Sequence, residues 1–197
     1  MRRLSEGAEA KIFETTIFGR SAVVKVRQEK KYRIRELDIA LRRSRTRSEA
    51  KLMHKAFGHG VRTPRIIALG KFSIFMERLR GRLLKDCDSS AAECREIGTM
   101  LARMHNAGIV HGDFTPANIM LCGGVPYVID FGLAADVGST EEKAIDLLLM
   151  KRSLPKKEYL IFEKSYAREG TGSRATLERL AEVEKRGRYQ VRTLAQI

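Results

Sequence analysis

The chain has 197 residues, of which 43% are hydrophobic, and 38 Lys and Arg against 24 Asp and Glu give a formal net charge of +14. This length and apolar content suffice for one large core, or for two small lobes that share a cleft. No apolar run approaches the roughly 18 residues of a membrane span, and Met1-Arg2-Arg3 is not followed by the apolar core of a secretory signal. We therefore expect a cytoplasmic protein with no membrane segment.

The net charge and the cysteines indicate which partners and which kinds of site to expect. Such a positive excess favours an anionic partner, RNA foremost, although a solubilising surface in a basic proteome is the alternative. The three cysteines are odd in number and form no CxxC pair, so neither a disulfide framework nor a zinc site is indicated. They are Cys87, Cys94 and Cys122.

The first part of the chain predicts strands and one helix. Two short β-branched runs, residues 10–13 and 22–26, are separated by a turn at residues 18–21. The stretch 30–47 is dense in basic residues, and a helix is expected from Arg45 to Phe57. A second strand pair is expected at residues 65–69 and 72–76, with Gly70-Lys71 between the strands.

The pattern then changes from strand to helix. A helix is expected over residues 91–107, with Ile97, Leu101 and Met104 on one face and Ser89 or Ser90 as its cap. A short hairpin should follow at residues 119–121 and 127–129. Three more helices are expected: one capped by Ser139 and Glu142, one opening at Pro155, and one over residues 174–186. This order predicts an α+β fold in two unequal lobes.

Two motifs that carry phosphoryl-transfer chemistry lie on either side of that short hairpin. In the segment from His111 to Asn118, Asp113 precedes Asn118 by five positions, a spacing that places a base and an amide metal ligand on one loop. Asp130 opens Asp130-Phe131-Gly132 directly after an apolar strand, so its carboxylate is expected to bind Mg²⁺. Either motif alone could arise by chance. Together they predict an ATP and Mg²⁺ site, with Asn118 and Asp130 as metal ligands and Asp113 as a catalytic residue.

A lysine in an apolar strand supplies the expected phosphate clamp. Lys25 lies within Ala22-Val23-Val24-Lys25-Val26, where a charge is costly unless it is paired. We expect it to meet phosphate and Glu49, on the following helix. The alternatives are an edge lysine and a surface pair of Glu49 with Arg45 or Arg47.

Two further segments are expected to contact the nucleotide. Glu77 and Leu79 follow a strand and would bind the adenine base through their backbone, although core packing explains the neighbouring Phe75 and Met76 equally well. The other segment precedes the first predicted hairpin, occupies the place of a glycine-rich phosphate cover and contains a single glycine. It consists of Leu4, Ser5, Glu6, Gly7, Ala8, Glu9, Ala10, Lys11 and Ile12.

These motifs together resemble the protein kinase superfamily, and within it the small atypical branch related to the RIO kinases. The sequence is most similar to the kinase/ATPase subunits of the KEOPS complex, which supports threonylcarbamoyladenosine formation in tRNA. The specific features are Glu6-Gly7-Ala8-Glu9-Ala10 and His111-Gly112-Asp113. The resemblance covers nearly the whole chain. It implies one kinase-like domain over residues 1–197, with an N-lobe and hinge at 1–79 and a reduced C-lobe with a basic tail at 80–197.

The resemblance also implies activity and partners. It implies weak Ser/Thr (auto)phosphorylation, ATPase activity coupled to tRNA modification, a small regulatory KEOPS subunit on the N-lobe, and the threonylcarbamoyl transferase subunit on the C-lobe. Gly112 replaces the arginine that reads a phosphorylated activation loop, and no Ala-Pro-Glu follows Gly132, so a peptide platform is not expected. The rivals are an aminoglycoside- or choline-type phosphotransferase and a non-catalytic scaffold that binds tRNA and partner subunits.

The basic tail is a candidate contact to tRNA phosphate or to the partner's active site. The alternative for this segment is a disordered basic end. The residues concerned are Lys185, Arg186, Arg188 and Arg192.

Overall fold

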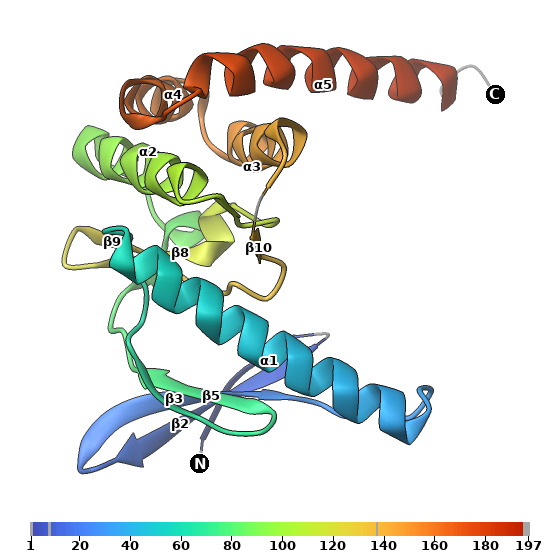
Figure 1. The fold of residues 1–197 in the computed structure, drawn as a ribbon. Helices are drawn as coiled ribbons and strands as arrows, with labels where there is room; N and C mark the ends of the chain where they lie inside the picture. Colours follow the sequence, from blue (N-terminus) through green and yellow to red (C-terminus); the bar gives the residue numbers. More distant parts are fainter. Residues whose placement is uncertain (1, 8, 137, 195–197) are drawn as a thin grey trace.

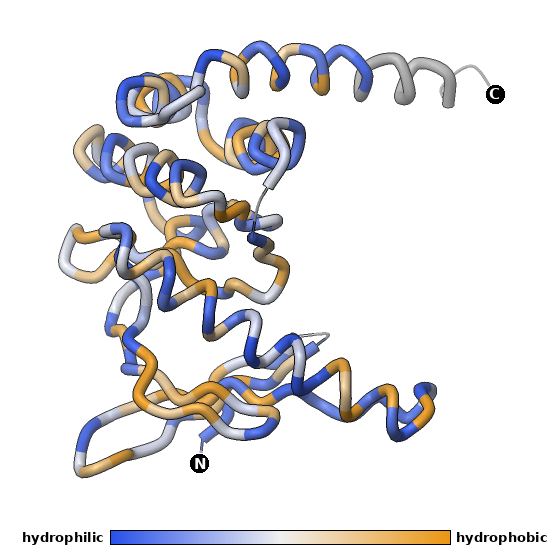
Figure 2. Tube along the Cα trace, viewed as in Figure 1, coloured by the Kyte–Doolittle hydropathy of each residue, from blue (hydrophilic) through white to orange (hydrophobic). Residues whose placement is uncertain are grey.

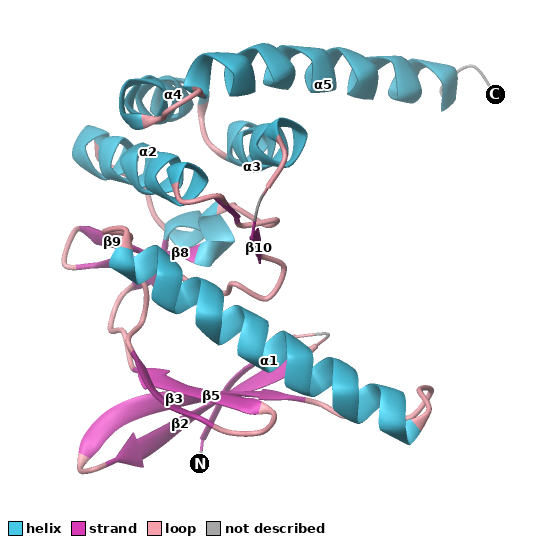
Figure 3. Ribbon diagram, in the orientation of Figure 1, coloured by secondary structure: helices cyan, strands magenta, loops and turns pink. Residues whose placement is uncertain are grey.

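The computed structural model describes residues 2–7, 9–136 and 138–194. Its sheet-rich N-terminal part and mostly helical C-terminal part confirm the α+β class (Figures 1 and 3). The main sheet is antiparallel with strand order β1-β2-β3-β5-β4, and helix α1 lies between this sheet and the C-terminal part. The elements of this part are β1 (Arg2–Glu6), β2 (Ala10–Ile17), β3 (Arg20–Arg27), α1 (Arg35–Gly58), β4 (Ile66–Leu69) and β5 (Ser73–Glu77).

The predicted hairpins of the N-terminal sheet are present. β2 and β3 pair in register from Ala10 with Arg27 to Ile17 with Arg20. Phe18 and Gly19 form the turn with φ of 49° and 73°, the left-handed geometry that matches the twist of a two-residue hairpin. β4 pairs with β5 as expected. Lys25 therefore lies near the middle of the sheet, on a strand with neighbours on both sides.

Two elements differ from expectation. Helix α1 begins at Arg35, ten residues before the predicted start, because Asp38 is buried and accepts from Arg42 one turn later over 2.6 Å. The many basic residues of this stretch did not suggest a helix. Its first turn contains Glu36 and Asp38, and acidic side chains are favourable at a helix N-terminus. Strand β1 was not predicted, since all five of its residues are exposed and it lacks an apolar face.

The C-terminal part is built from helices around a small hairpin. Helices α2 and α4 pack against each other, as do α3 and α5. The predicted capping box of Ser139 with Glu142 is formed, and Ser90, one of the two predicted caps of α2, forms a second capping box with Glu93. The elements are β6 (Arg82–Leu83), η1 (Leu84–Asp86), α2 (Ala91–Asn106), β7 (Ile109–Val110), η2 (Pro116–Asn118), β8 (Ile119–Cys122), β9 (Val125–Val128), β10 (Ala135–Asp136), α3 (Thr140–Ser153), α4 (Lys156–Glu169) and α5 (Ser173–Leu194).

Helix α5 is longer than expected, since it continues past Arg186 to Leu194. Ion pairs with α3 hold its middle: Arg179 contacts Glu141, and Arg186 lies 3.3 Å from the same carboxylate. The side chains of Arg188 and Arg192 lie outside the described residues.

One continuous core joins the two parts. The predicted apolar face of α2, Ile97, Leu101 and Met104, is fully buried in it. Polar and apolar residues alternate along the described helices (Figure 2), and none of these helices is long and apolar enough to cross a membrane.

The close contact of α2 with α4 depends on a glycine. A Cβ on Gly98 would lie 2.2 Å from the carbonyl oxygen of Phe162, a backbone atom that has no room to retreat. We expect Gly98→Ala to destabilise the protein by about 1–3 kcal/mol through overpacking. Gly58→Ala is the matched control, because nothing lies within 4 Å of its Cβ position at the end of α1. Urea unfolding of both variants tests this, and equal midpoints would contradict it.

Candidate active site

Lys25 is the centre of a buried ion-pair cluster. Its side chain is 9% exposed, and Nζ donates over 2.6 Å both to Oε1 of Glu49 and to Oδ1 of Asp130. The second oxygen of Glu49 accepts from Nη2 of Arg27, also over 2.6 Å. Glu49 therefore faces the sheet, and the alternative pairing with Arg45 or Arg47 does not occur. Sheet, helix α1 and the Asp130 loop are joined at one ammonium group.

The catalytic loop brings Asp113 and Asn118 together. Nδ2 of Asn118 donates to the backbone oxygen and to Oδ2 of Asp113, each over 2.8 Å. Because this amide nitrogen is used within the loop, Oδ1 of Asn118 is the atom suited to a metal. Pro116 opens the short helix η2 that spaces the two residues.

Asp130 has a strained backbone and a lowered pKa. Its φ is 60°, uncommon for a non-glycine residue, and its side chain accepts from Gly132 N–H over 3.1 Å. Partial burial raises the pKa of this carboxyl, but the charge of Lys25 and its hydrogen bond outweigh burial and leave the pKa lowered. Phe131 is buried against His111, with ring centroids 5.2 Å apart. Burial of this ring anchors the turn and holds Asp130 in the cleft, ionised at neutral pH.

The backbone of the catalytic loop is held by Asp146, which the sequence analysis missed. This carboxylate is fully buried on α3 and accepts from His111 N–H over 2.7 Å and from Gly112 N–H over 2.9 Å. The signal was available: Asp146 is the one charged residue in the apolar run Ala144-Ile145-Asp146-Leu147-Leu148. A carboxylate at such a place requires buried donors.

Two buried histidines complete this anchor, and both are neutral. His111 accepts from Asp113 N–H at Nδ1 and donates from Nε2 to the oxygen of Ile129. His105 lies between the hydroxyl of Tyr166 at 2.8 Å and Asp146 at 3.2 Å, an arrangement that a neutral ring satisfies. Burial is the main cause that lowers the pKa of each histidine. His111 therefore holds the catalytic loop through both ring nitrogens.

These histidines make stability depend on pH. Below the unfolded pKa of about 6.5 the unfolded chain binds protons that the folded chain does not, so stability falls as pH decreases. We expect a loss of up to about 1.4 kcal/mol per pH unit for each histidine between pH 6.5 and 5. Thermal unfolding across this range measures it, and His105→Gln should reduce the slope. An unfolding temperature that stays constant from pH 7 to pH 5 would contradict neutral burial.

Two adjoining cavities contain most of the predicted nucleotide-binding residues. One, of about 420 Å³, reaches the strand end and includes Leu4, Glu77, Leu79 and Asn118. The other, of about 500 Å³, includes Glu6, Gly7, Glu9, Ala10 and Asp113. Residues Ser5, Ile12, Lys25 and Asp130 line both cavities, which makes the Lys25 cluster their common wall.

Two of the predicted contacts, at Lys11 and Glu77, differ in detail, and a third is not described by the structure. Lys11 lines neither cavity, because it alternates with Ala10 and Ile12 on β2 and pairs with Glu6 over 3.0 Å. Ala8 lies outside the described residues. The backbone N–H of Glu77 donates to the backbone oxygen of Arg65 over 2.9 Å. Of the backbone groups of Glu77, the carbonyl is therefore the one left to bind an adenine base.

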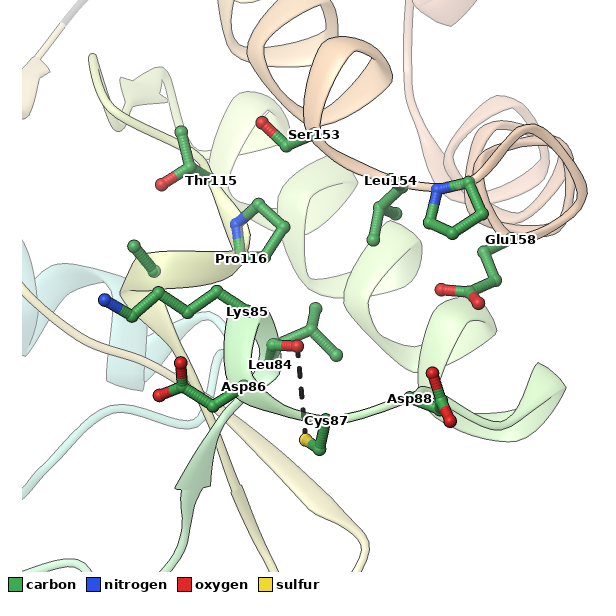
Figure 4. A pocket seen from close by; sticks show the side chains of 12 residues that line it. Leu84, Lys85, Asp86, Cys87, Asp88, Thr115, Pro116, Ser153, Leu154 and Glu158 are labelled. Atoms are coloured by element: carbon green, nitrogen blue, oxygen red, sulfur yellow. Dashed lines mark hydrogen bonds between the residues drawn. The ribbon is translucent and has the colours of Figure 1, made fainter.

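A larger cavity, of about 780 Å³, lies on the other side of the catalytic loop (Figure 4). Thr115 and Pro116 form one wall, and Leu154 and Glu158 form the opposite wall. Lys85 stands beside the acidic Asp86 at its edge. None of the predicted nucleotide-binding residues lines this cavity, so the cavity with the larger volume is not the predicted nucleotide site.

A two-part fold, a lysine shared by Glu49 and Asp130, and a loop with Asp113 and Asn118 together define a kinase-like protein. A RIO domain profile matches residues 8–152. The chain belongs to the RIO domain family, and proteins named Bud32 are among its relatives. A protein from Archaeoglobus fulgidus, named as a probable serine/threonine-protein kinase BUD32 homolog, is 42% identical over 92% of each chain. The Pyrococcus abyssi protein named KEOPS complex subunit Bud32 is 34% identical over 98% of each.

Longer relatives and solved structures extend this comparison. A probable bifunctional tRNA threonylcarbamoyladenosine biosynthesis protein from Methanothermobacter thermautotrophicus is 39% identical over 94% of this chain, which spans 36% of that protein's length. The fold is similar to that of Rio2 kinase from Chaetomium thermophilum in an ADP/Mg²⁺-phosphoaspartate complex, with a TM-score of 0.67 at 16% identity over 96% of this chain and 72% of that one. At this identity the likeness shows the kinase-like fold alone.

Proposed function

We propose that this chain is an Mg²⁺-dependent ATPase and atypical Ser/Thr protein kinase that supports threonylcarbamoyladenosine modification of tRNA as a KEOPS subunit. The observation that carries the proposal is the Lys25 cluster, in which one buried ammonium joins Glu49 and Asp130 between two cavities. A buried cation with a metal-binding carboxylate at 2.6 Å suits a phosphate chain and its metal.

Each residue has a defined role in this reaction. Lys25, positioned by Glu49, clamps the phosphates. Asn118 and Asp130 would hold Mg²⁺, which would supply positive charge to the phosphate oxygens. Asp113 orients the attacking water or protein hydroxyl and accepts its proton. A bond forms between that oxygen and the terminal phosphorus as the bridging bond to ADP breaks. The adenine base occupies the cavity at Glu77 and Leu79, and the segment from Leu4 to Ile12 covers the phosphates.

The names of the relatives support a role as a subunit of a larger assembly. The bifunctional proteins carry a region similar to this chain within a single threonylcarbamoyladenosine biosynthesis protein, which supports a threonylcarbamoyl transferase subunit as partner. We place that subunit on residues 80–197 and a small regulatory subunit on residues 1–79, with tRNA on the basic surface that includes Lys185 and Arg186. A cytoplasmic location fits tRNA modification.

Titration of the protein with radiolabelled ATP, with and without tRNA and the partner subunits, tests the proposal. We expect slow hydrolysis by the isolated chain and a marked increase in the assembled complex. Turnover that an aminoglycoside or choline stimulates would contradict the coupled ATPase and favour a small-molecule phosphotransferase. Complete absence of turnover in the assembled complex would indicate a scaffold.

A further inference from the structure

Arg27 is a second buried cation of the phosphate-side cavity, and neither the motifs nor the mechanism above uses it. It follows Lys25 by two positions on β3, so both side chains leave the same face of the strand. Arg27 is 5% exposed, and it shares the carboxylate of Glu49 with Lys25. Lys25 also pairs with Asp130 over 2.6 Å, whereas Glu9, the other carboxylate near Arg27, lies 3.7 Å from it.

One donor of this guanidinium is unmatched. Nε of Arg27 is buried and has no hydrogen-bond partner among the described residues. Nη1 lies 3.7 Å from Oε2 of Glu9, beyond hydrogen-bonding distance. Buried donors are normally satisfied, because an unpaired one loses its hydration without replacement. An acceptor from outside the chain would resolve this.

The position of Arg27 indicates where that acceptor lies. Arg27 lines the 500 Å³ cavity together with Asp113, whereas neither residue is among those that line the cavity at Glu77 and Leu79. A Cβ added to Gly132 would meet Nζ of Lys25 at 3.6 Å and Nη2 of Arg27 at 3.9 Å, so both cations border the backbone that follows Asp130. Arg27 is therefore at the end of the site where the reacting phosphate must lie.

We propose that Arg27 is a phosphate-binding residue that contacts the terminal phosphate of the nucleoside triphosphate. This assignment rests on the proposed function. The planar fork of arginine matches two phosphate oxygens, and its charge strengthens each hydrogen bond. Lys25 contacts the inner phosphates, as strand lysines of kinases do. The site then discriminates ATP from ADP, because the diphosphate lacks the group that Arg27 contacts.

Calorimetric titration of the full chain with ATP, ADP and adenosine, in the presence of Mg²⁺, tests the assignment. Arg27→Lys keeps the charge and a donor for Glu49 but lacks the Nε donor, and Arg27→Gln also removes the charge. We expect both variants to bind ATP about tenfold more weakly or worse, with smaller losses for ADP and none for adenosine. Arg42→Lys is the matched control: Arg42 is a largely buried arginine paired with Asp38 over 2.6 Å, outside both cavities, and its ATP to ADP ratio should stay unchanged.

Equal loss of ATP and ADP affinity would overturn the assignment, since it would mean that Arg27 acts only by holding Glu49 and Lys25. Unchanged ATP affinity in Arg27→Lys would overturn it as well. Thermal unfolding shows whether each variant is folded. If Arg27→Gln does not fold, the comparison of Arg27→Lys with the wild-type chain decides the assignment. A wild-type chain that binds no ATP would contradict the proposed function and the assignment together, whereas intact ATP binding with an unchanged ratio contradicts the assignment alone.

Discussion

Asp113→Asn is expected to lower kcat for ATP hydrolysis by about 10²- to 10⁴-fold, the usual contribution of a positioned general base. The loop should keep its shape, because an asparagine oxygen can still accept from Nδ2 of Asn118, which donates over 2.8 Å in the wild-type chain. ATP affinity should therefore change little. Single-turnover hydrolysis and calorimetric binding separate the two effects.

A neighbouring carboxylate supplies the control for Asp113. Asp86 is exposed and lines the 780 Å³ cavity on the other side of the catalytic loop. Asp86→Asn should leave kcat unchanged, because this residue contacts neither nucleotide cavity. If Asp113→Asn hydrolyses ATP at the wild-type rate, Asp113 is not the catalytic carboxylate.

Asp146→Ala is expected to cost about 3–5 kcal/mol of stability and to reduce ATP turnover. It removes the acceptor of His111 N–H and Gly112 N–H and the partner of His105, and each buried donor left unpaired costs roughly 1–3 kcal/mol. Asp146→Asn has the same shape but loses the charge and one acceptor, so we expect an intermediate loss. Urea unfolding measures stability, and turnover is measured on folded protein.

Asp38→Ala is the control that separates an effect on stability from an effect on the catalytic loop. Asp38 is also a buried carboxylate, 2% exposed and paired with Arg42, but it lies at the start of α1 and away from the catalytic loop. Its loss should destabilise the protein while the folded fraction keeps its turnover. An Asp146→Ala variant as stable and as active as wild type would show that the loop does not depend on this anchor.

The sequence predicted the elements that have a local signal. Lys25 stood out because it interrupts an apolar strand, and the two motifs around the hairpin placed Asp113, Asn118 and Asp130 at one cleft. Strand β1 was missed because an exposed edge strand needs no apolar face, and its pairing with β2 is visible only in three dimensions. The first ten residues of α1 were missed because their stabilising ion pairs resembled a solvated basic run.

Two residues of the candidate site were missed for a different reason. Asp146 acts on a loop 35 positions earlier in the chain, and its partners are backbone groups that no side-chain motif records. Arg27 follows Lys25 in a strand where a terminal arginine suggests only a solvated strand end. Its burial arises from α1, which brings Glu49 within 2.6 Å.

Mg²⁺-dependent ATP turnover by the wild-type chain and by Asp130→Asn, measured side by side, tests the central claim most directly. Asp130 joins the metal site to Lys25, so the amide should lose metal-dependent turnover while the neutral side chain still fits the turn before Phe131. We predict hydrolysis by the wild-type protein that EDTA abolishes, and none above background for Asp130→Asn. Wild-type rates in Asp130→Asn, or wild-type turnover that EDTA leaves intact, would contradict an ATP and Mg²⁺ site at this cluster.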